Sequence, residues 1–434
     1  MFQFYNILLK YKQTILWLLL VVIGGMFGGF VVGGVFCIPL LFKGDTLIKV
    51  ESLFILFILI FFLGDNFKGI FSFAQNLRFV ILGIGLLVLL RFELFKFNVA
   101  RWILPFSIVA TSITYALSPL GIEATARGIS YFLVALVIFK CVQLLVGHDA
   151  KRFYDLLLIV LFLYFVVNLF LFFIPILDGV FIKGRYTGLM GNPNGLGLVA
   201  MLSYGIVEVI RKKNQTSFNR LFFNGFKVLL FSLIILTASR TSLFGVLVFE
   251  IVLRLLKYKF LLALALLFIG FIYNMSDTFS VEAIATSFGL SDFLRIDTLE
   301  DASGRTEVWV VAMEEIQKQP WLGKGMLYDN YFILDYGDRY FGEFRARHWY
   351  GIWNSYLSLL LNVGFVGLLT YAFFWYKMYA LSQMKIVRFA FLVMCLFSAV
   401  SESWMAASMN AFTPLVFLCW ALQIYQSETK QNTL

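Results

Sequence analysis

Long, uninterrupted apolar runs fill most of the chain and predict its secondary structure. There are fourteen such segments, several of them short: 14–25, 27–42, 50–64, 77–90, 102–120, 128–146, 154–176, 194–210, 227–238, 242–253, 260–274, 354–376, 389–401 and 405–425. Because the runs are continuous and do not alternate with polar residues, they predict helices in lipid and exclude a β-barrel. We therefore expect an all-α, polytopic membrane protein with about 12–14 transmembrane helices.

Two joins between these segments leave the number of spans open. Glycine pairs at 24–25 and 28–29 separate the first two segments, and Ser239-Arg240-Thr241 separates segments 227–238 and 242–253. Each join is either a tight turn between short helices or a break within one long helix. Twelve spans is the alternative count.

One polar stretch interrupts the apolar pattern. Residues 275–353 carry 13 Asp and Glu against 7 Lys and Arg, with apolar segments on both sides. Such a stretch predicts a folded extramembrane loop, and loops on a rigid scaffold often carry functional sites. The chain then divides into a helical bundle over 1–274, a large loop over 275–353, and further helices over 354–434 that complete the same bundle.

Residues 304–318 of this loop have the spacing of an amphipathic helix. The predicted apolar side consists of Val308, Trp309, Val311, Ala312 and Ile316, and the predicted wet side of Glu307, Glu314 and Glu315. Ser303 is a suitable cap for its start, and the turn-forming sequence at 320–325 follows its end.

Composition agrees with the membrane assignment and narrows the chemistry. The chain is 61% hydrophobic and 14% charged, far from the balance of a soluble domain. Its four cysteines lie within apolar runs, its two histidines are too few for a metal cage, and it lacks P-loop, H-E-x-x-H and G-x-S-x-G motifs. We expect no cofactor and no metal site.

The charge distribution predicts the orientation of the chain. With fourteen spans, 21 of the 35 Lys and Arg lie on the side of the N-terminus, and seven of the 13 on the opposite side lie in the large loop. The positive-inside rule then places both termini in the cytoplasm and the loop outside. The net charge of +10 mostly reflects this topology and does not indicate a nucleic-acid partner.

Three arginines on the predicted outer side suggest a phosphate site. Arg240 lies between two apolar segments, where a guanidinium is costly unless it has a function; the alternative is an interfacial arginine whose head reaches the headgroups. Arg305 lies at the start of the amphipathic helix, among free backbone N–H groups, although it could equally be an exposed surface residue. Arg185 is the weakest of the three candidates. Since guanidinium groups match phosphate oxygens in pairs, these residues suggest a lipid-linked phosphate or diphosphate.

Two residues on the same side are candidate general bases. His348 follows Arg345 and Arg347, and a neutral imidazole can accept a proton from a sugar hydroxyl; a structural role is the alternative. Glu402 lies between two apolar segments, where desolvation raises the pKa of a carboxyl group.

Asparagine side chains supply donors that suit sugar hydroxyls. Asn192 and Asn194 form a turn with such donors, although Asn192 also fits a simple helix cap. Asn354 is a further candidate for substrate binding.

Several short motifs, taken in order, resemble the O-antigen ligase and polymerase superfamily. The similar sequences are Gly191-Asn192-Pro193-Asn194, Ser239-Arg240, Gly304-Arg305-Thr306 with Trp309, the stretch 320–325, Asn354-Ser355-Tyr356-Leu357, and Gly364-Phe365-Val366-Gly367. Each motif is weak alone, but their order, spacing and common side over roughly 185–370 make the combination fairly specific. The resemblance implies a bacterial inner-membrane enzyme that acts at the periplasmic face on glycans linked to undecaprenyl diphosphate.

One departure from the family pattern favours the polymerase branch. Ligases of this family typically have a histidine before the position of Asn354, whereas this chain has Trp353, whose indole has no basic nitrogen. Either His348 takes that role or the protein is a polymerase, which is the interpretation favoured here. The resemblance implies that Arg240 and Arg305 bind the diphosphate and that His348 or Glu402 activates the acceptor hydroxyl, without a metal.

The resemblance also implies partners and leaves two alternatives. Expected partners are the lipid-linked oligosaccharide as donor and acceptor, the membrane lipid, and a chain-length regulator protein. One alternative is a ligase that transfers the glycan to the lipid A-core. The other is a non-enzymatic flippase or transporter of lipid-linked sugars, which would not require so large an outer loop.

Overall fold

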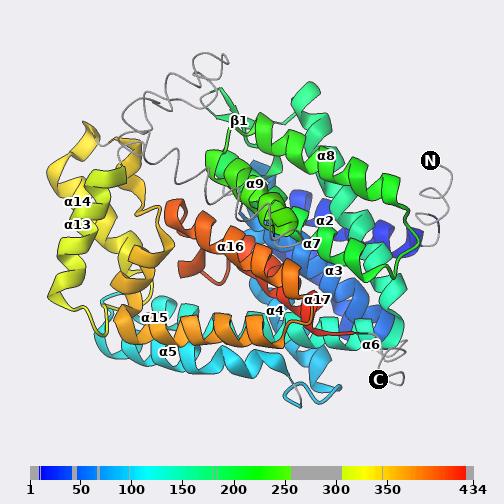
Figure 1. Ribbon diagram of the computed structural model, residues 1–434, viewed down its shortest axis with the longest axis horizontal. Helices are drawn as coiled ribbons and strands as arrows, with labels where there is room; N and C mark the ends of the chain where they lie inside the picture. Colours follow the sequence, from blue (N-terminus) through cyan, green and yellow to red (C-terminus); the bar gives the residue numbers. More distant parts are fainter. Residues whose placement is uncertain are drawn as a thin grey trace.

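The predicted all-α fold is confirmed by a computed structural model (Figure 1). It describes residues 9, 11–41, 46–65, 69–96, 98–177, 179–182, 184–255, 305–344 and 346–426. Its α-helices are α2 (Lys12–Val35), α3 (Thr46–Gly64), α4 (Phe73–Leu90), α5 (Leu104–Leu117), α6 (Gly121–Phe173), α7 (Pro193–Lys213), α8 (Arg220–Leu236), α9 (Arg240–Leu255), α13 (Arg305–Lys318), α14 (Tyr328–Tyr340), α15 (Ser355–Leu381), α16 (Lys385–Ser401) and α17 (Phe412–Ile424). The strands β1 (Phe181–Ile182) and β2 (Arg185–Tyr186) form a short antiparallel pair.

The described residues include six helical stretches that are long and apolar enough to cross a membrane. They contain α2, α3, α4, α6, α7 and α15, while α5 and α17 are shorter apolar helices. The 53 residues of α6 contain a non-helical residue, Asp149, which divides this stretch into two helices. This agrees with the predicted segments 128–146 and 154–176. The predicted segment 260–274 lies outside the described residues.

Both doubtful joins of the sequence are turns. At Gly29 the backbone leaves the helical region with a φ of 70°, and the chain reverses. The Trp17 Nε1 therefore donates a hydrogen bond to the Phe36 carbonyl at 3.0 Å, across the two halves of this hairpin. At the second join α8 ends at Leu236 and α9 begins at Arg240, so that the short segment 237–239 connects two separate helices.

The helices α13 and α14 lie together at one end of the molecule and are joined to the bundle by α15 (Figure 1). The predicted amphipathic helix is confirmed as α13, and Val308, Ala312 and Ile316 are buried in a small apolar core beneath it. Glu315 was predicted on the wet side, and this is wrong. It is buried, and its carboxylate accepts a 2.7 Å hydrogen bond from Tyr328 and pairs with Lys324.

A sharp bend in α15 docks the turn after α13 onto the bundle. The bend is at Gly364, where φ is 61°. Four backbone hydrogen bonds connect the two segments: Lys324 N to Leu361 O (2.8 Å), Gly325 N to Asn362 O (2.7 Å), Phe365 N to Pro320 O (2.9 Å) and Val366 N to Trp321 O (3.1 Å). The motif at 320–325 and the motif at 364–367 are therefore two halves of one structural junction.

Replacing Gly323 by alanine should destabilise this junction. Gly323 has a φ of 65°, and an added Cβ would lie 2.7 Å from the backbone of Asn362 and Gly364. We expect a loss of at least about 2 kcal/mol of unfolding free energy, from strain and from backbone displacement. Thermal unfolding in detergent measures it. Gly83→Ala is the matched control, because Gly83 is helical with open space around its Cα, and it should leave the melting temperature unchanged or raised.

Candidate functional site

Arg185 lies on a short β-hairpin and connects two helices. Its guanidinium donates to the Thr237 carbonyl at 3.1 and 3.0 Å and to the Ala238 carbonyl at 3.2 Å, in the segment between α8 and α9. It also donates to the Asn194 Oδ1 at 2.7 Å, in the first turn of α7. A guanidinium can serve several acceptors at once because its five N–H donors are held in a fixed fork.

The two asparagines of the turn before α7 have different roles. Asn192 is the N-cap of α7, and its Oδ1 accepts a 3.0 Å hydrogen bond from the Asn194 amide. This is the role of helix cap that the sequence offered as the alternative to sugar binding. The Asn194 side chain instead reaches across the site, and its Nδ2 donates to the Glu402 Oε1 at 2.7 Å. Asn194 thus joins Arg185 to Glu402.

Arg305 meets the same carboxylate from the loop side. It is the first residue of α13, and its Nη2 lies 3.7 Å from the Glu402 Oε1 while its Nη1 donates to the Ser401 carbonyl. Its guanidinium carbon also lies 5.7 Å from the ring centre of Trp353. Arg305 therefore links the loop to the bundle at the end of α16, through its ion pair with Glu402 and its hydrogen bond to the Ser401 carbonyl.

Arg240 begins α9 and lies between residues that contact both groups. Ala238, two residues earlier, accepts a hydrogen bond from Arg185. Thr241, the next residue, shares a 2.6 Å hydrogen bond with the Ser401 hydroxyl, beside Glu402. The half-buried Arg240 is therefore flanked along the chain by one residue that contacts Arg185 and by another that contacts the end of α16.

Glu402 is the centre of this arrangement. It is 5% exposed, and burial raises the pKa of its carboxyl group, while Arg305, Asn194 and Arg185 act in the opposite direction. Since burial has the larger effect, this carboxyl group gives up its proton less readily than one in water. A carboxylate formed here is also a stronger base.

The non-helical segment after α16 holds Glu402 in place. Ser355, the first residue of α15, donates from its Oγ to the Glu402 carbonyl at 2.6 Å and accepts from the Met405 amide at 3.1 Å. The Tyr131 hydroxyl, from α6, donates to the Met405 carbonyl at 2.6 Å. Asn354, a predicted binding residue, is the N-cap of α15 and accepts from the backbone amides of Tyr356 and Leu357 at 2.9 and 3.1 Å.

The candidates around His348 lie farther from these contacts. The His348 Nε2 is 3.7 Å from the Glu307 carboxylate, on the first turn of α13, and its backbone carbonyl accepts a 3.1 Å hydrogen bond from Trp353. Trp353 therefore connects His348 to Arg305, with its indole N–H on the His348 carbonyl and its ring face toward Arg305. Arg347 begins a short 3₁₀ helix (Arg347–Tyr350), and Arg345 lies outside the described residues.

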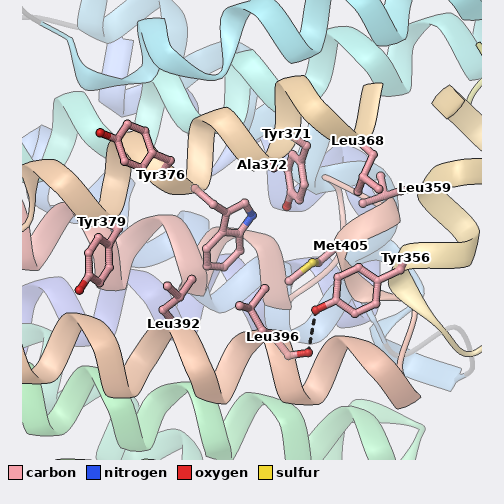
Figure 2. Close-up of a pocket in the computed structure, with 11 residues that line it drawn as sticks. Tyr356, Leu359, Leu368, Tyr371, Ala372, Tyr376, Tyr379, Leu392, Leu396 and Met405 are labelled. Atoms are coloured by element: carbon pink, nitrogen blue, oxygen red, sulfur yellow. Dashed lines mark hydrogen bonds between the residues drawn. The ribbon is translucent and has the colours of Figure 1, made fainter. Parts of the chain in front are cut away.

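An apolar pocket lies between α15 and α16 (Figure 2). It has a volume of about 330 Å³ and is lined by α15, α16 and the segment after Glu402, with Tyr356, Leu359, Leu368, Tyr371, Ala372, Trp375, Tyr376, Tyr379, Leu392, Leu396 and Met405 around it. Tyr356 directly follows Ser355, and its hydroxyl donates to the Leu396 carbonyl at 2.9 Å (Figure 2). The apolar pocket therefore adjoins the polar residues at the start of α15 and the end of α16.

Sequence reasoning missed two residues of this site. Ser355 was quoted only within a motif, although it holds Glu402 from a helix that begins 47 positions earlier in the chain. Trp353 was considered only as a missing base, yet its indole contacts Arg305 and the backbone of His348. Their position on either side of Asn354, a predicted substrate-binding residue, was the available signal.

Comparison with protein families confirms the resemblance. The family described as O-antigen ligase matches residues 225–372, from α8 to α15, so this part of the chain is similar to that family. The matched region contains Arg240, Arg305, His348, Trp353 and Asn354, while Arg185, Asn194 and Glu402 lie outside it. No curated protein matches the chain. The fold is that of a multi-pass helical membrane protein, and its residues 225–372 are similar to the O-antigen ligase family.

Proposed function

We propose that the protein is a polymerase of O-antigen or a related surface polysaccharide. It transfers a glycan chain from undecaprenyl diphosphate to the sugar of another lipid-linked repeat unit, at the periplasmic face of the bacterial inner membrane. Both termini are then cytoplasmic. The convergence of Arg185, Asn194 and Arg305 on the buried Glu402, next to an apolar pocket, is the observation that carries this proposal.

The arrangement suits a donor that is anionic at one end and hydrocarbon at the other. In this mechanism Arg240 and Arg305 bind the diphosphate through paired N–H donors, and the lipid chain enters the apolar pocket. The acceptor hydroxyl attacks the anomeric carbon, the bond from that carbon to the diphosphate oxygen breaks, and the arginines stabilise the charge that leaves. No metal is needed, since cationic side chains already neutralise the leaving group.

The proton of the acceptor hydroxyl goes to a general base. Glu402 is favoured here, since its carboxyl group lies among the arginines and has a raised pKa. His348 is the other candidate, and its imidazole faces Glu307 near the start of α13. Asn194, held by both Arg185 and Glu402, is placed to bind a sugar hydroxyl when substrate enters.

The choice of polymerase over ligase rests on Trp353. The indole N–H of this residue donates to a backbone carbonyl and its ring faces Arg305, so a histidine-based reaction at this position is not available. A ligase would use the same donor with the lipid A-core as acceptor. A flippase is disfavoured, because a buried carboxylate held by donors at one end of the helices suits chemistry at one face.

Deletion of the gene, followed by separation of surface glycans by chain length, tests this function. We expect loss of long chains while single repeat units remain attached to the lipid A-core, because ligation still proceeds. Complete loss of attached glycan would instead identify a ligase. Unchanged glycans would contradict both the polymerase and the ligase. A chain-length regulator is an expected partner, and it should change the chain-length distribution only when the polymerase is present.

A further inference from the structure

The helices that carry the candidate site at one end surround a basic cavity at the other. Asn194 lies in the first turn of α7 and Glu402 directly follows α16, whereas the cavity lies at the opposite ends of these helices, with α8 and α9 (Figure 1). Its volume is about 960 Å³. The 21 residues of α7 span about 30 Å, which is the thickness of the hydrocarbon core. The cavity is therefore separate from the candidate site and lies at the other membrane face.

Cationic side chains outnumber acidic ones around this cavity. The cations are Arg211, Lys212, Arg220, Lys227, Arg254 and Lys385, and the carboxylates are Glu208 and Glu250. The positive-inside rule accounts for cations on this face of the membrane. This rule does not explain why cations from four helices line the same cavity.

The two carboxylates are already matched by part of this set. The buried Glu208 accepts bonds from Arg211 at 2.8 and 2.6 Å, and it pairs with Lys227 at 2.6 Å. Lys227 also lies 2.9 Å from Glu250, which accepts a 2.6 Å hydrogen bond from Tyr204. These contacts neutralise the two carboxylates that line the cavity.

The remaining cations face an open space. Lys212, Arg220 and Lys385 are exposed, and none of them forms an ion pair within the described part of the chain. Arg220 and Lys385 also begin α8 and α16, where backbone N–H groups lack helical partners and favour an anion. Three exposed cations and two helix N-termini therefore face this cavity, in addition to the cations that already pair with its two carboxylates.

Apolar side chains at the rim place this cavity beside lipid. Val228 is 65% exposed and Ile386 is 40% exposed, and both line it. We propose that the cavity binds a phosphate group, presented by an anionic membrane lipid or free in solution. The bound phosphate links α7, α8 and α16, and so stabilises the helices that hold Asn194 and Glu402 at the other face.

Thermal unfolding of the whole protein in lipid nanodiscs tests this site. The protein is compared in phosphatidylcholine alone, in phosphatidylcholine with phosphatidylglycerol, and in phosphatidylcholine with inorganic phosphate at matched ionic strength. The variant is Lys212→Gln with Lys385→Gln. The matched control is Lys12→Gln with Lys151→Gln, which removes two exposed lysines, one at the start of α2 and one beside the break in α6. These two segments are joined by the Tyr11–Arg152 hydrogen bond.

We expect phosphatidylglycerol or phosphate to raise the melting temperature of the wild type and the control by about 3 °C or more. The Lys212/Lys385 variant should lose at least half of this rise while keeping the wild-type melting temperature in phosphatidylcholine alone. A rise with phosphatidylglycerol identifies a lipid headgroup, and a rise with inorganic phosphate identifies a free anion. No rise in the wild type, or an equal rise in the Lys212/Lys385 variant, overturns the proposal.

Discussion

Arg305→Lys and Arg240→Lys should each reduce glycan transfer by about 100-fold or more. Lysine keeps the charge but presents a single ammonium, so it loses the paired N–H donors that match two phosphate oxygens. Removal of one preorganised donor to a developing negative charge typically costs about 10²–10³ in rate. Extension of a lipid-linked repeat unit by the purified protein measures the effect.

Arg339→Lys is the matched control for these two variants. Arg339 is an exposed arginine of the loop helix α14, and it pairs with Asp335 at 2.7 Å, away from Glu402. This variant should keep wild-type activity and melting temperature. Near-normal activity of both the Arg305 and the Arg240 variants would remove their proposed role in binding diphosphate.

The sequence predicted which residues share one side of the membrane, but it could not predict their contacts. Counting the apolar segments placed Arg185, Arg240 and Glu402 on the same side. In the structure Asn194 joins Arg185 to Glu402, and Thr241, the residue after Arg240, contacts Ser401. The bond from Asn194 to Glu402 joins residues 208 positions apart. Pairing over such separations depends on how helices pack, and hydropathy carries no information about it.

Glu315 shows that a prediction based on charge can contradict the helical spacing and be wrong. It lies seven positions after Val308 and one before Ile316, so helical spacing puts it on the buried face. The prediction treated it as wet because it is charged. Burial acts to raise the pKa of this carboxyl group, but hydrogen bonds from Lys318, Lys324 and Tyr328 outweigh it and lower the pKa to about 2.

In the sequence, the junction between 320–325 and 364–367 appears only as two separate motifs that contain glycine. A glycine with a positive φ is expected at a turn, and the stretch 320–325 was predicted to be one. In the folded protein Gly323 lies close to the backbone of 361–364 and Gly364 close to the backbone of 321–322. This contact depends on the bend of α15 and could not be predicted from either motif alone. It explains why both motifs carry glycine at the point of contact.

Glu402→Gln should reduce transfer by about 10²–10⁴-fold and remove the acidic limb of the pH profile. Glutamine keeps an oxygen that can accept the Asn194 hydrogen bond, so the site should remain assembled. In the wild type, burial raises the pKa of Glu402. Since the carboxylate form is the base, activity should fall as the pH is lowered through this raised pKa.

His348→Gln is the comparison that assigns the base. His348 lies beside Glu307 and Trp353, and it is the other candidate base at this site. If Glu402 is the base, the His348 variant keeps both its rate within about tenfold and the acidic limb of the profile. A large loss in the His348 variant, with a Glu402 variant that stays active at all pH values, would assign proton transfer to the imidazole. Glu402 would then act through Arg305, as the charge that holds this arginine at the end of α16.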